Sequence, residues 1–400
     1  MNKIRNILFL TSAISILGFT VFSCSTAKQA ETFYHPADFE PSASTCFVWT
    51  TDFYEIVPKL AGIISKKDKV TLFVKENADQ ENIKRILEKY ESNIENIDFI
   101  SLNWIPANAW LRDFGPVYLV SNRGKKELVN FLYFRSRLKF VDQIAEKQKI
   151  SLTQIPLNST GGSREVNGKG TVILVESHEL LENKPKTKEV IEAELKNALH
   201  LQKIIWLKQG IPQDDGQFTG PIFEDIYPNG VNGHVDEFCR FADAETVMIS
   251  YVSEDEAGSH PILAEAKKRL DENYQILTES TDQDGNKLNV IQVPFAPLLI
   301  FEQPTPQAKR KTAAVTSYMN FIVTNSLVIL PSYVDVADDS NREAFQAKEN
   351  EVIRIFQKVF PSKEIIPVPA YDLNRFSGGF HCISINAPLG GAVSEPPSPQ

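Results

Sequence analysis

Residues 54–74, YEIVPKLAGIISKKDKVTLFV, join an amphipathic segment to a short run of β-branched and aromatic residues. Apolar residues recur through 54–65 at helical spacing, whereas residues 70–74 are almost all apolar, which is typical of a buried strand. The polar stretch KKDK separates the two. This helix-to-strand order predicts one unit of an α/β fold.

The same order recurs along the chain. A helix at 79–90 is expected before a strand at 97–102, a helix at 187–201 before a strand at 204–207, and a helix at 256–273 before a strand at 289–293. A further helix is expected to start near Ser340, with Asp339 or Ser340 as its N-cap, before a strand at 365–368. Residues 318–330, YMNFIVTNSLVIL, predict a hairpin that turns at 324–326. The sequence therefore predicts an α/β protein, and several similar modules in one domain are compatible with it.

Composition sets the broad class of protein. The 400 residues are 42% hydrophobic and 10% aromatic, enough for a large buried core. Acidic residues outnumber basic ones by 51 to 42, giving a formal charge of −9. This balance argues against a nucleic-acid partner, and it weakly favours a cationic substrate.

The amino-terminal stretch predicts export. Lys3 and Arg5 precede an apolar run at 7–22, which indicates a signal peptide over residues 1–23. Residues 21–24, VFSC, resemble a bacterial lipobox, so Cys24 is the expected lipidation site and membrane anchor, facing the periplasm or the cell surface. A cleaved soluble export and an uncleaved anchor are the alternatives. Residues 24–45 would form a tether and the start of the fold, and residues 390–400 a flexible tail.

Cysteine usage predicts neither a disulfide scaffold nor a structural metal site. The chain has four cysteines, Cys24, Cys46, Cys239 and Cys382, and an odd number remains if Cys24 carries lipid. At least one free thiol is therefore expected. No Cys/His cluster has the spacing of a zinc site.

Glycines surround a polar stretch at 160–171, TGGSREVNGKGT. A phosphate-binding loop needs a helix behind it, but this stretch precedes the apolar run TVILVE, which predicts a strand. The stretch is therefore not a nucleotide loop. It is one of four segments that follow predicted strands, where α/β folds place functional residues. The others are WLRDFGP at 110–116, NGHVDEF at 232–238 and GGFHCISIN at 378–386.

In NGHVDEF, an extended chain would direct His234 and Asp236 to one face, and Glu237 and Cys239 to the other. This geometry pairs an imidazole with a carboxylate. Two alternatives are a surface histidine and aspartate on a strand edge, and a metal site with two ligands.

Two further segments carry candidate chemistry with structural alternatives. Cys382 follows two glycines that would let a substrate approach, although a cysteine is often an inert core residue. His381 would face away from Cys382 in an extended chain. In WLRDFGP, Trp110 could form an aromatic wall and Asp113 could accept a fork of donors, or Arg112 and Asp113 could make structural salt bridges around a turn.

Taken together and in this order, WLRDFGP, TGGSREVNGKGT, GHVDEFCRF, SYMNFIVTNSLVILPSY and GGFHCISINAP resemble the agmatine deiminase and Porphyromonas-type peptidyl-arginine deiminase family. The resemblance runs from about Phe47 to Pro388. It implies a single catalytic domain at 46–389, folded as a five-bladed α/β propeller (pentein) of ββαβ modules around a central site.

The resemblance also implies roles for individual residues. Cys382 matches the nucleophile and His234 the general acid/base, while Asp113 and Asp236 match the carboxylates that hold a guanidinium. The residues expected around the substrate besides these aspartates are Trp110, Asn320, Thr160 and Gly161. No metal and no organic cofactor is implied.

Three positions depart from the usual agmatine deiminase pattern. Thr160 stands where a glutamate is usual, Asn232 stands where an aspartate is common, and Ser163 also differs. A threonine hydroxyl adds no charge, so His234 should be less basic than it would be beside a carboxylate. Arg164 or Arg375 could meet a substrate carboxylate, with exposed or structurally paired arginines as the alternative.

The expected function is hydrolytic deimination of agmatine or of an arginine side chain, with release of ammonia through a covalent Cys382 intermediate. Amidino transfer to an amine is a second enzymatic possibility on the same fold. An inactive, surface-anchored guanidinium- or peptide-binding protein is the non-enzymatic one. The sequence does not predict an oligomeric state.

Overall fold

The structure is a computed structural model and describes residues 30–50, 55–216, 218–304 and 309–389. All elements below belong to one compact unit that begins at Thr32. The predicted signal peptide, Cys24 and the predicted tail at 390–400 lie outside the described residues. Within the described part, no helix is both long and apolar enough to cross a bilayer.

The first helix-to-strand unit forms as its sequence predicts. The apolar face of helix α1 (Ile56–Ser65) is buried, including Leu60 and Ile64. Strand β3 (Val70–Lys75) is buried except for Lys75, which is exposed. Strand β2 (Ser42–Val48) pairs with β3 in parallel. Strand β4 (Ile97–Leu102), which follows helix α2 (Gln80–Lys89) in the sequence, pairs with the other edge of β3, also in parallel. The late strand β20 (Ile385–Pro388) completes this sheet, antiparallel to β2.

Four more sheets repeat one connection, in which a strand pairs antiparallel with the next, and a helical crossover leads to a third, parallel strand. The strands and helices of these sheets are β5 (Val117–Ser121), β6 (Lys126–Leu132), α4 (Phe140–Gln148) and β7 (Ser151–Asn158); β8 (Arg164–Val166), β9 (Thr171–Val175), α5 (Glu176–Glu182), α6 (Lys188–Leu199) and β10 (Lys203–Leu207); β12 (Cys239–Phe241), β13 (Thr246–Tyr251), α7 (Glu254–Ser259), α8 (Pro261–Glu279) and β14 (Asn289–Pro294); and β17 (Ile322–Val323), β18 (Leu327–Ser332), α9 (Arg342–Val359) and β19 (Glu364–Pro369).

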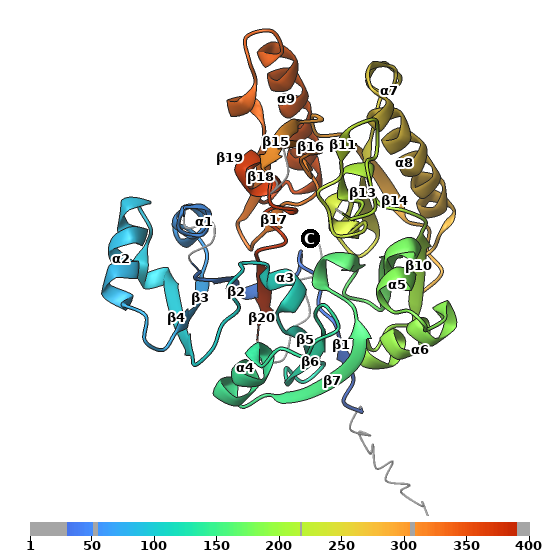
Figure 1. Cartoon of the computed structure of the whole chain (residues 1–400). Coiled ribbons are helices and arrows are strands. Elements are labelled where there is room, and N and C mark those ends of the chain that lie inside the picture. The colour runs from blue at the N-terminus through green and yellow to red at the C-terminus, as the bar shows by residue number, and fades with distance from the viewer. Residues whose placement is uncertain (1–29, 51–54, 217, 305–308, 390–400) are drawn as a thin grey trace, which may run out of the picture. The chain divides into compact units, whose positions relative to one another are not determined.

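The remaining elements are short or peripheral. Strand β1 (Phe33–Tyr34) pairs with β5, and β11 (Ile226–Tyr227), β15 (Ile300–Pro304) and β16 (Lys309–Ala313) form a sixth sheet among the described residues. Helices α3 (Leu111–Phe114) and α10 (Tyr371–Asn374) have four residues each. In Figure 1 the longer helices α1, α2, α4, α6, α8 and α9 lie on the outside, and α3 lies closer to the middle of this unit.

The expected strands and the hairpin turn at 324–326 are confirmed, but two helix predictions were wrong in detail. The helix expected at 256–273 is two helices, because the backbone of His260 is extended and Pro261 starts α8. Helix α9 begins at Arg342 with Asn341 as its N-cap. The carboxylate of Asp338 accepts from the backbone N–H groups of Ser340 and Asn341, which holds the preceding residues in a turn.

Candidate active site

Cys382 lies in the turn before β20, and its side chain is buried among polar groups. The amide Nδ2 of Asn320 lies 3.2 Å from Cys382 Sγ. Sγ also lies 3.5 Å from Glu237 Oε1 and 3.7 Å from Asp236 Oδ2. Burial raises the pKa of the Cys382 thiol well above its ordinary value, and the carboxylates of Asp236, Glu237 and Asp113 raise it further.

His234 immediately precedes a 3₁₀ turn at Val235–Glu237. Its backbone N–H donates to Asp214 Oδ2 at 2.5 Å, and its Nε2 lies 2.9 Å from Thr160 Oγ1. Burial alone would lower the pKa of His234, but the surrounding carboxylates outweigh burial and raise it. These carboxylates belong to Asp113, Asp236, Asp214 and Glu179.

The two aspartates expected to hold a guanidinium both lie beside His234; Asp236 is fully buried and the side chain of Asp113 is 10% exposed. Asp113 Oδ1 accepts from the backbone N–H of Gly162 at 3.2 Å and lies 3.9 Å from His234 Nδ1. Asp236 Oδ1 is buried without a hydrogen-bond partner among the described residues. A buried oxygen without a donor is costly to the protein alone, so Asp236 has an acceptor to offer to a ligand.

A close backbone approach underlies this cluster. A Cβ atom built on Gly162 would lie 2.6 Å from His234 Nδ1 and 3.0 Å from Asp236 Oδ2. No side chain fits there without displacing one of these groups. The second glycine of TGGS therefore lets the 160–163 segment pack directly against the imidazole and the carboxylate. Gly161 lines a neighbouring cavity instead, where its own Cβ would meet the backbone of Arg112.

The expected extended conformation at 234–238 was wrong. Because residues 235–237 form a 3₁₀ turn, Asp236 and Glu237 both approach Cys382, and Glu237 does not face away with Cys239. His381 also does not face away from the site. Residues 380–383 are a turn, and His381 Nδ1 lies 2.6 Å from Asp236 Oδ2.

A cavity of about 420 Å³ opens next to this cluster. Trp110, Asp113, Thr160 and His234 line it, together with Tyr133, His178, Glu182 and Asn232. Three exposed phenylalanines, Phe134, Phe218 and Phe376, also border the cavity. Its volume is in the range of small-molecule sites.

The thiol lies behind the inner wall of this cavity. Cys382 is 3% exposed and is not among the lining residues. A Cβ on Gly378 would lie 2.8 Å from Trp110 Cζ3 and 3.1 Å from Cys382 Sγ, so Gly378 packs between the indole and the sulfur. Gly378 and the indole of Trp110 thus lie between the cavity and Cys382 Sγ.

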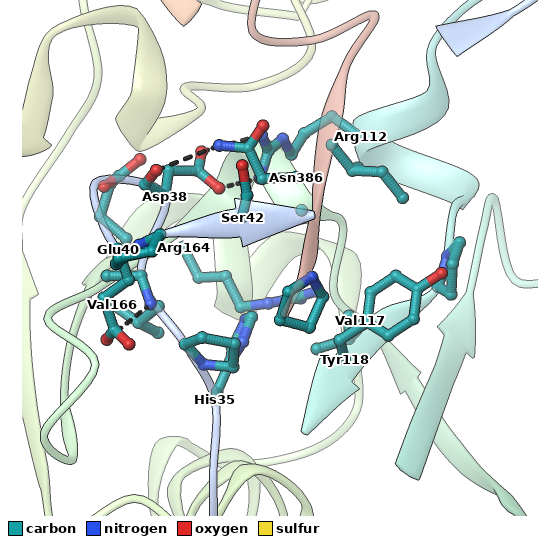
Figure 2. A pocket seen from close by; sticks show the side chains of 18 residues that line it. His35, Asp38, Glu40, Ser42, Arg112, Val117, Tyr118, Arg164, Val166 and Asn386 are labelled. Atoms are coloured by element: carbon teal, nitrogen blue, oxygen red, sulfur yellow. Dashed lines mark hydrogen bonds and ion pairs between the residues drawn. The ribbon is translucent and has the colours of Figure 1, made fainter. Parts of the chain in front are cut away.

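A second, much smaller cavity of about 60 Å³ lies on the other side of the cluster (Figure 2). It is too small for an organic substrate. Asp38, which Figure 2 draws beside Arg112 and Asn386, pairs with Arg112 at 2.8 Å and with Arg240 at 3.1 Å. Asp38 Oδ2 also lies 2.6 Å from His381 Nε2. The segment before β2 therefore contacts His381, and His381 in turn contacts the carboxylate of Asp236 in the site.

Sequence reasoning missed several groups that surround His234. Asp214 accepts from the backbone of Val231 and His234, and burial raises its pKa to about 7. Burial likewise raises the pKa of Glu179 to about 7, and Glu179 accepts from Ser163 Oγ at 2.7 Å. The only sequence signal for Asp214 was its place after a strand, which many surface residues share.

The candidate arginines have structural partners. Arg164 is buried, donates to the carbonyls of Ser159 and Thr160, and lies over the ring of Phe131. Arg375 lies over the rings of Phe301 and Tyr371. Both arginines therefore fit the alternative in which they are structurally paired and do not bind a substrate carboxylate.

The fold and the site define a class of protein: an α/β chain of repeated helix-linked sheets that buries a thiol, an imidazole and several carboxylates in one polar centre. A family model described as Porphyromonas-type peptidyl-arginine deiminase matches residues 34–388. The chain belongs to this family, as the five sequence motifs indicated.

Individual relatives agree with this family. The chain is 26% identical to an agmatine deiminase of Pseudomonas syringae pv. tomato, over 91% of this chain and 98% of that protein. A solved agmatine deiminase of Enterococcus faecalis is 23% identical and superposes with a TM-score of 0.71, over 90% of this chain and 96% of that chain. A solved C. jejuni agmatine deiminase with substrate bound is 22% identical, with a TM-score of 0.67 over 90% and 98% of the two chains. These structures show the same fold.

Proposed function

We propose that this protein hydrolyses the guanidinium group of its substrate to a ureido group with release of ammonia. The observation that carries the proposal is the convergence of Cys382, His234, Asp113 and Asp236 from three separate segments of the chain. Asp236 Oδ1 is buried there without a partner among the described residues. The family membership and the agmatine deiminases among the relatives support the same reaction.

The electrostatics of the site suit a guanidinium. A guanidinium is charged at any physiological pH and presents planar pairs of N–H donors, which carboxylates accept in a fork. Asp113 and Asp236 would each take such a pair. Three atoms that could ligate a metal, one each from Asp236, Glu237 and Cys382, lie within 4.8 Å of one another. A guanidinium brings positive charge to the same place and satisfies the oxygens with hydrogen bonds.

The reaction would proceed through a covalent intermediate. The Cys382 thiolate attacks the central carbon, which resonance makes a poor electrophile, and a tetrahedral adduct forms. The surrounding carboxylates raise the pKa of His234, which favours the protonated imidazole. His234 can then protonate the departing ammonia, and the neutral ring can activate the water that hydrolyses the thiouronium.

Agmatine is the first substrate to test, because several relatives are named for it. A substrate with an arginine side chain in a peptide is the second candidate, supported by the family description and by the exposed aromatic rings at the cavity. Such rings could pack against a body larger than agmatine.

The proposal extends to architecture and location. The five helix-linked sheets would be the five blades of an α/β propeller around this site. Residues 1–23 would direct export, and a lipid on Cys24 would anchor the protein at the periplasmic or cell-surface side of a membrane. Mass spectrometry of the mature amino terminus tests the lipid, and an unmodified Cys24 would refute the anchor.

The decisive experiment measures ammonia and ureido product from agmatine, free arginine, and peptides with internal or carboxyl-terminal arginine. Cys382→Ala serves as the control. Product analysis in the presence of an amine distinguishes hydrolysis from amidino transfer. Turnover that survives in Cys382→Ala would refute the covalent route, and binding without any turnover would favour the inactive binding protein.

A further inference from the structure

Attack by Cys382 requires that its thiol lose a proton, and the structure restricts which group can take it. Among the described residues, the hydrogen-bonding side chains within reach of Sγ are those of Asn320, Glu237 and Asp236. His234 is not one of them, and its Nε2 lies against Thr160. The imidazole that would protonate ammonia is therefore not placed to accept the thiol proton directly.

Asp236 is a poor acceptor for this proton. Its Oδ2, the oxygen that lies 3.7 Å from Sγ, already lies 2.6 Å from His381 Nδ1. Burial would raise the pKa of Asp236, but the hydrogen bond and charge of His381 lower it below its ordinary value. A carboxylate that holds an imidazole so closely keeps its negative charge, which suits it for gripping a cation.

Glu237 is placed differently. Its Oε1 lies 3.5 Å from Cys382 Sγ and accepts from Asn320 Nδ2 at 2.9 Å. Its Oε2 is buried without a hydrogen-bond partner among the described residues, and the side chain is 2% exposed. Asn320 Nδ2 thus bridges the carboxylate and the sulfur, and it can stabilise negative charge on either atom.

From this geometry we propose that Glu237 is a further catalytic residue, which accepts the proton of the Cys382 thiol when a guanidinium enters the site. The S–H bond breaks, its electron pair stays on sulfur, and the proton forms an O–H bond on Glu237. When the intermediate is hydrolysed, the departing sulfur takes the proton back. This inference rests on the proposed deimination.

The charges around Glu237 make such a transfer feasible. Burial, followed by Asp236 and Asp214, holds the pKa of Glu237 well above its ordinary value, so its carboxylate accepts a proton more readily than an ordinary one. The titratable groups that act electrostatically on Glu237 are Asp113 of α3, Asp214, Asp236 and Cys382, and Glu237 in turn acts on Tyr333. An arriving guanidinium compensates the thiolate that the transfer creates.

Glu237→Gln tests the inference, because the amide keeps the volume and the acceptor for Asn320 but cannot take a proton at Oε1. We expect kcat to fall by about 100-fold or more, with little change in KM. Alkylation of Cys382 by iodoacetamide, measured by mass spectrometry at neutral pH with guanidinium chloride as the bound cation, should become slower. Glu237→Asp, which retains a displaced carboxylate, should recover part of both rates.

The alternative is that Glu237 only adds negative charge beside the thiol. Removing that charge would then lower the thiol pKa, so Glu237→Gln would be alkylated faster and turn over as well as the wild type. That result would overturn the inference. Glu349→Gln is the matched control, because Glu349 is also buried but binds Ser332 and Tyr333 away from the sulfur.

The alkylation assay does not depend on turnover, so the two proposals can fail separately. Slower alkylation of Glu237→Gln, in a protein that releases no ammonia from any guanidinium, would refute the deimination and keep the proton transfer. Faster alkylation of this variant in an active enzyme would refute the role of Glu237 alone.

Discussion

Thr160 Oγ1 lies 2.9 Å from Nε2 of His234, so an uncharged hydroxyl is the direct hydrogen-bond partner of the proposed acid. The positive charge on the imidazole is instead balanced by carboxylates farther from this nitrogen, among them Asp113 and Asp214. The resemblance to agmatine deiminases predicts that His234 is less basic beside Thr160 than it would be beside a glutamate. The surrounding acids keep its pKa above the ordinary value nonetheless.

Thr160→Val should lower kcat by about 3- to 10-fold, because one hydrogen bond of about 1 kcal/mol that orients the ring is lost. Steady-state ammonia release measures it. Thr153→Val on the exposed face of β7 is the matched control and should behave as the wild type. An unchanged kcat in Thr160→Val would show that the contact does not orient His234.

Guanidinium binding should lower the pH at which Cys382 becomes reactive. Burial and then Asp236, Glu237 and Asp113 raise the pKa of the empty-site thiol, and a bound cation offsets the three carboxylates. The rate of iodoacetamide alkylation against pH, with and without guanidinium chloride, measures the shift. Identical profiles would contradict it.

Gly378→Ala should reduce kcat/KM by about 100-fold, because the new methyl group must displace Trp110 or Cys382 from its position. Thermal unfolding should change little, since the strain falls on the side chains of Trp110 and Cys382 beside the cavity. Gly258→Ala is the control, because a Cβ there meets no heavy atom within 4 Å. A fully active Gly378→Ala would mean that these side chains relax freely.

Asp38→Ala should destabilise the fold by about 3 kcal/mol, because it leaves Arg112 and the buried Arg240 without their shared carboxylate. Urea unfolding measures the loss. Removing the exposed carboxylate of Glu302, which pairs with Lys309 at the surface, should leave the midpoint unchanged. Equal midpoints for the two variants would argue against a structural role for Asp38.

His178 should make the protein less stable in mild acid. Burial, followed by the charge of His234, lowers the pKa of His178 to about 3, whereas an unfolded histidine titrates near 6.5. Between these values the unfolded chain binds a proton that the folded chain does not. The free energy of unfolding should therefore fall by about 1.4 kcal/mol for each pH unit below 6.5. His178→Gln should remove this part of the slope in urea titrations, and an unchanged slope would contradict the assignment.

The periodic parts of the fold could be predicted from sequence because each helix and strand buries its own apolar face. The strand at 97–102 has the expected bounds, and helix α2, expected at 79–90, spans Gln80–Lys89 with Asp79 as its N-cap. The geometry of the site could not be predicted in the same way. Glu237 was assigned to the wrong face because alternation assumes a strand, and the 3₁₀ turn at 235–237 follows from tertiary contacts of His234 with Asp214.

The support behind the site was equally hidden from local patterns. Asp38 and His381 are 343 residues apart in sequence, and β20, which follows His381, must pair with β2, which follows Asp38, to bring them together. No periodicity links them. The family motifs indicated Cys382 and His234 as site residues. The buried acids around His234 become apparent only from the three-dimensional arrangement of the loops.

The pairing of β20 with β2 also governs when the site can come into being. Two residues separate Cys382 from the start of β20, and β20 docks on a strand made hundreds of residues earlier. During synthesis, the sulfur and the strand that fixes it therefore leave the ribosome after nearly all other parts of the pocket. A growing chain holds no assembled reaction centre, and chemistry at Cys382 begins only once β20 has paired with β2.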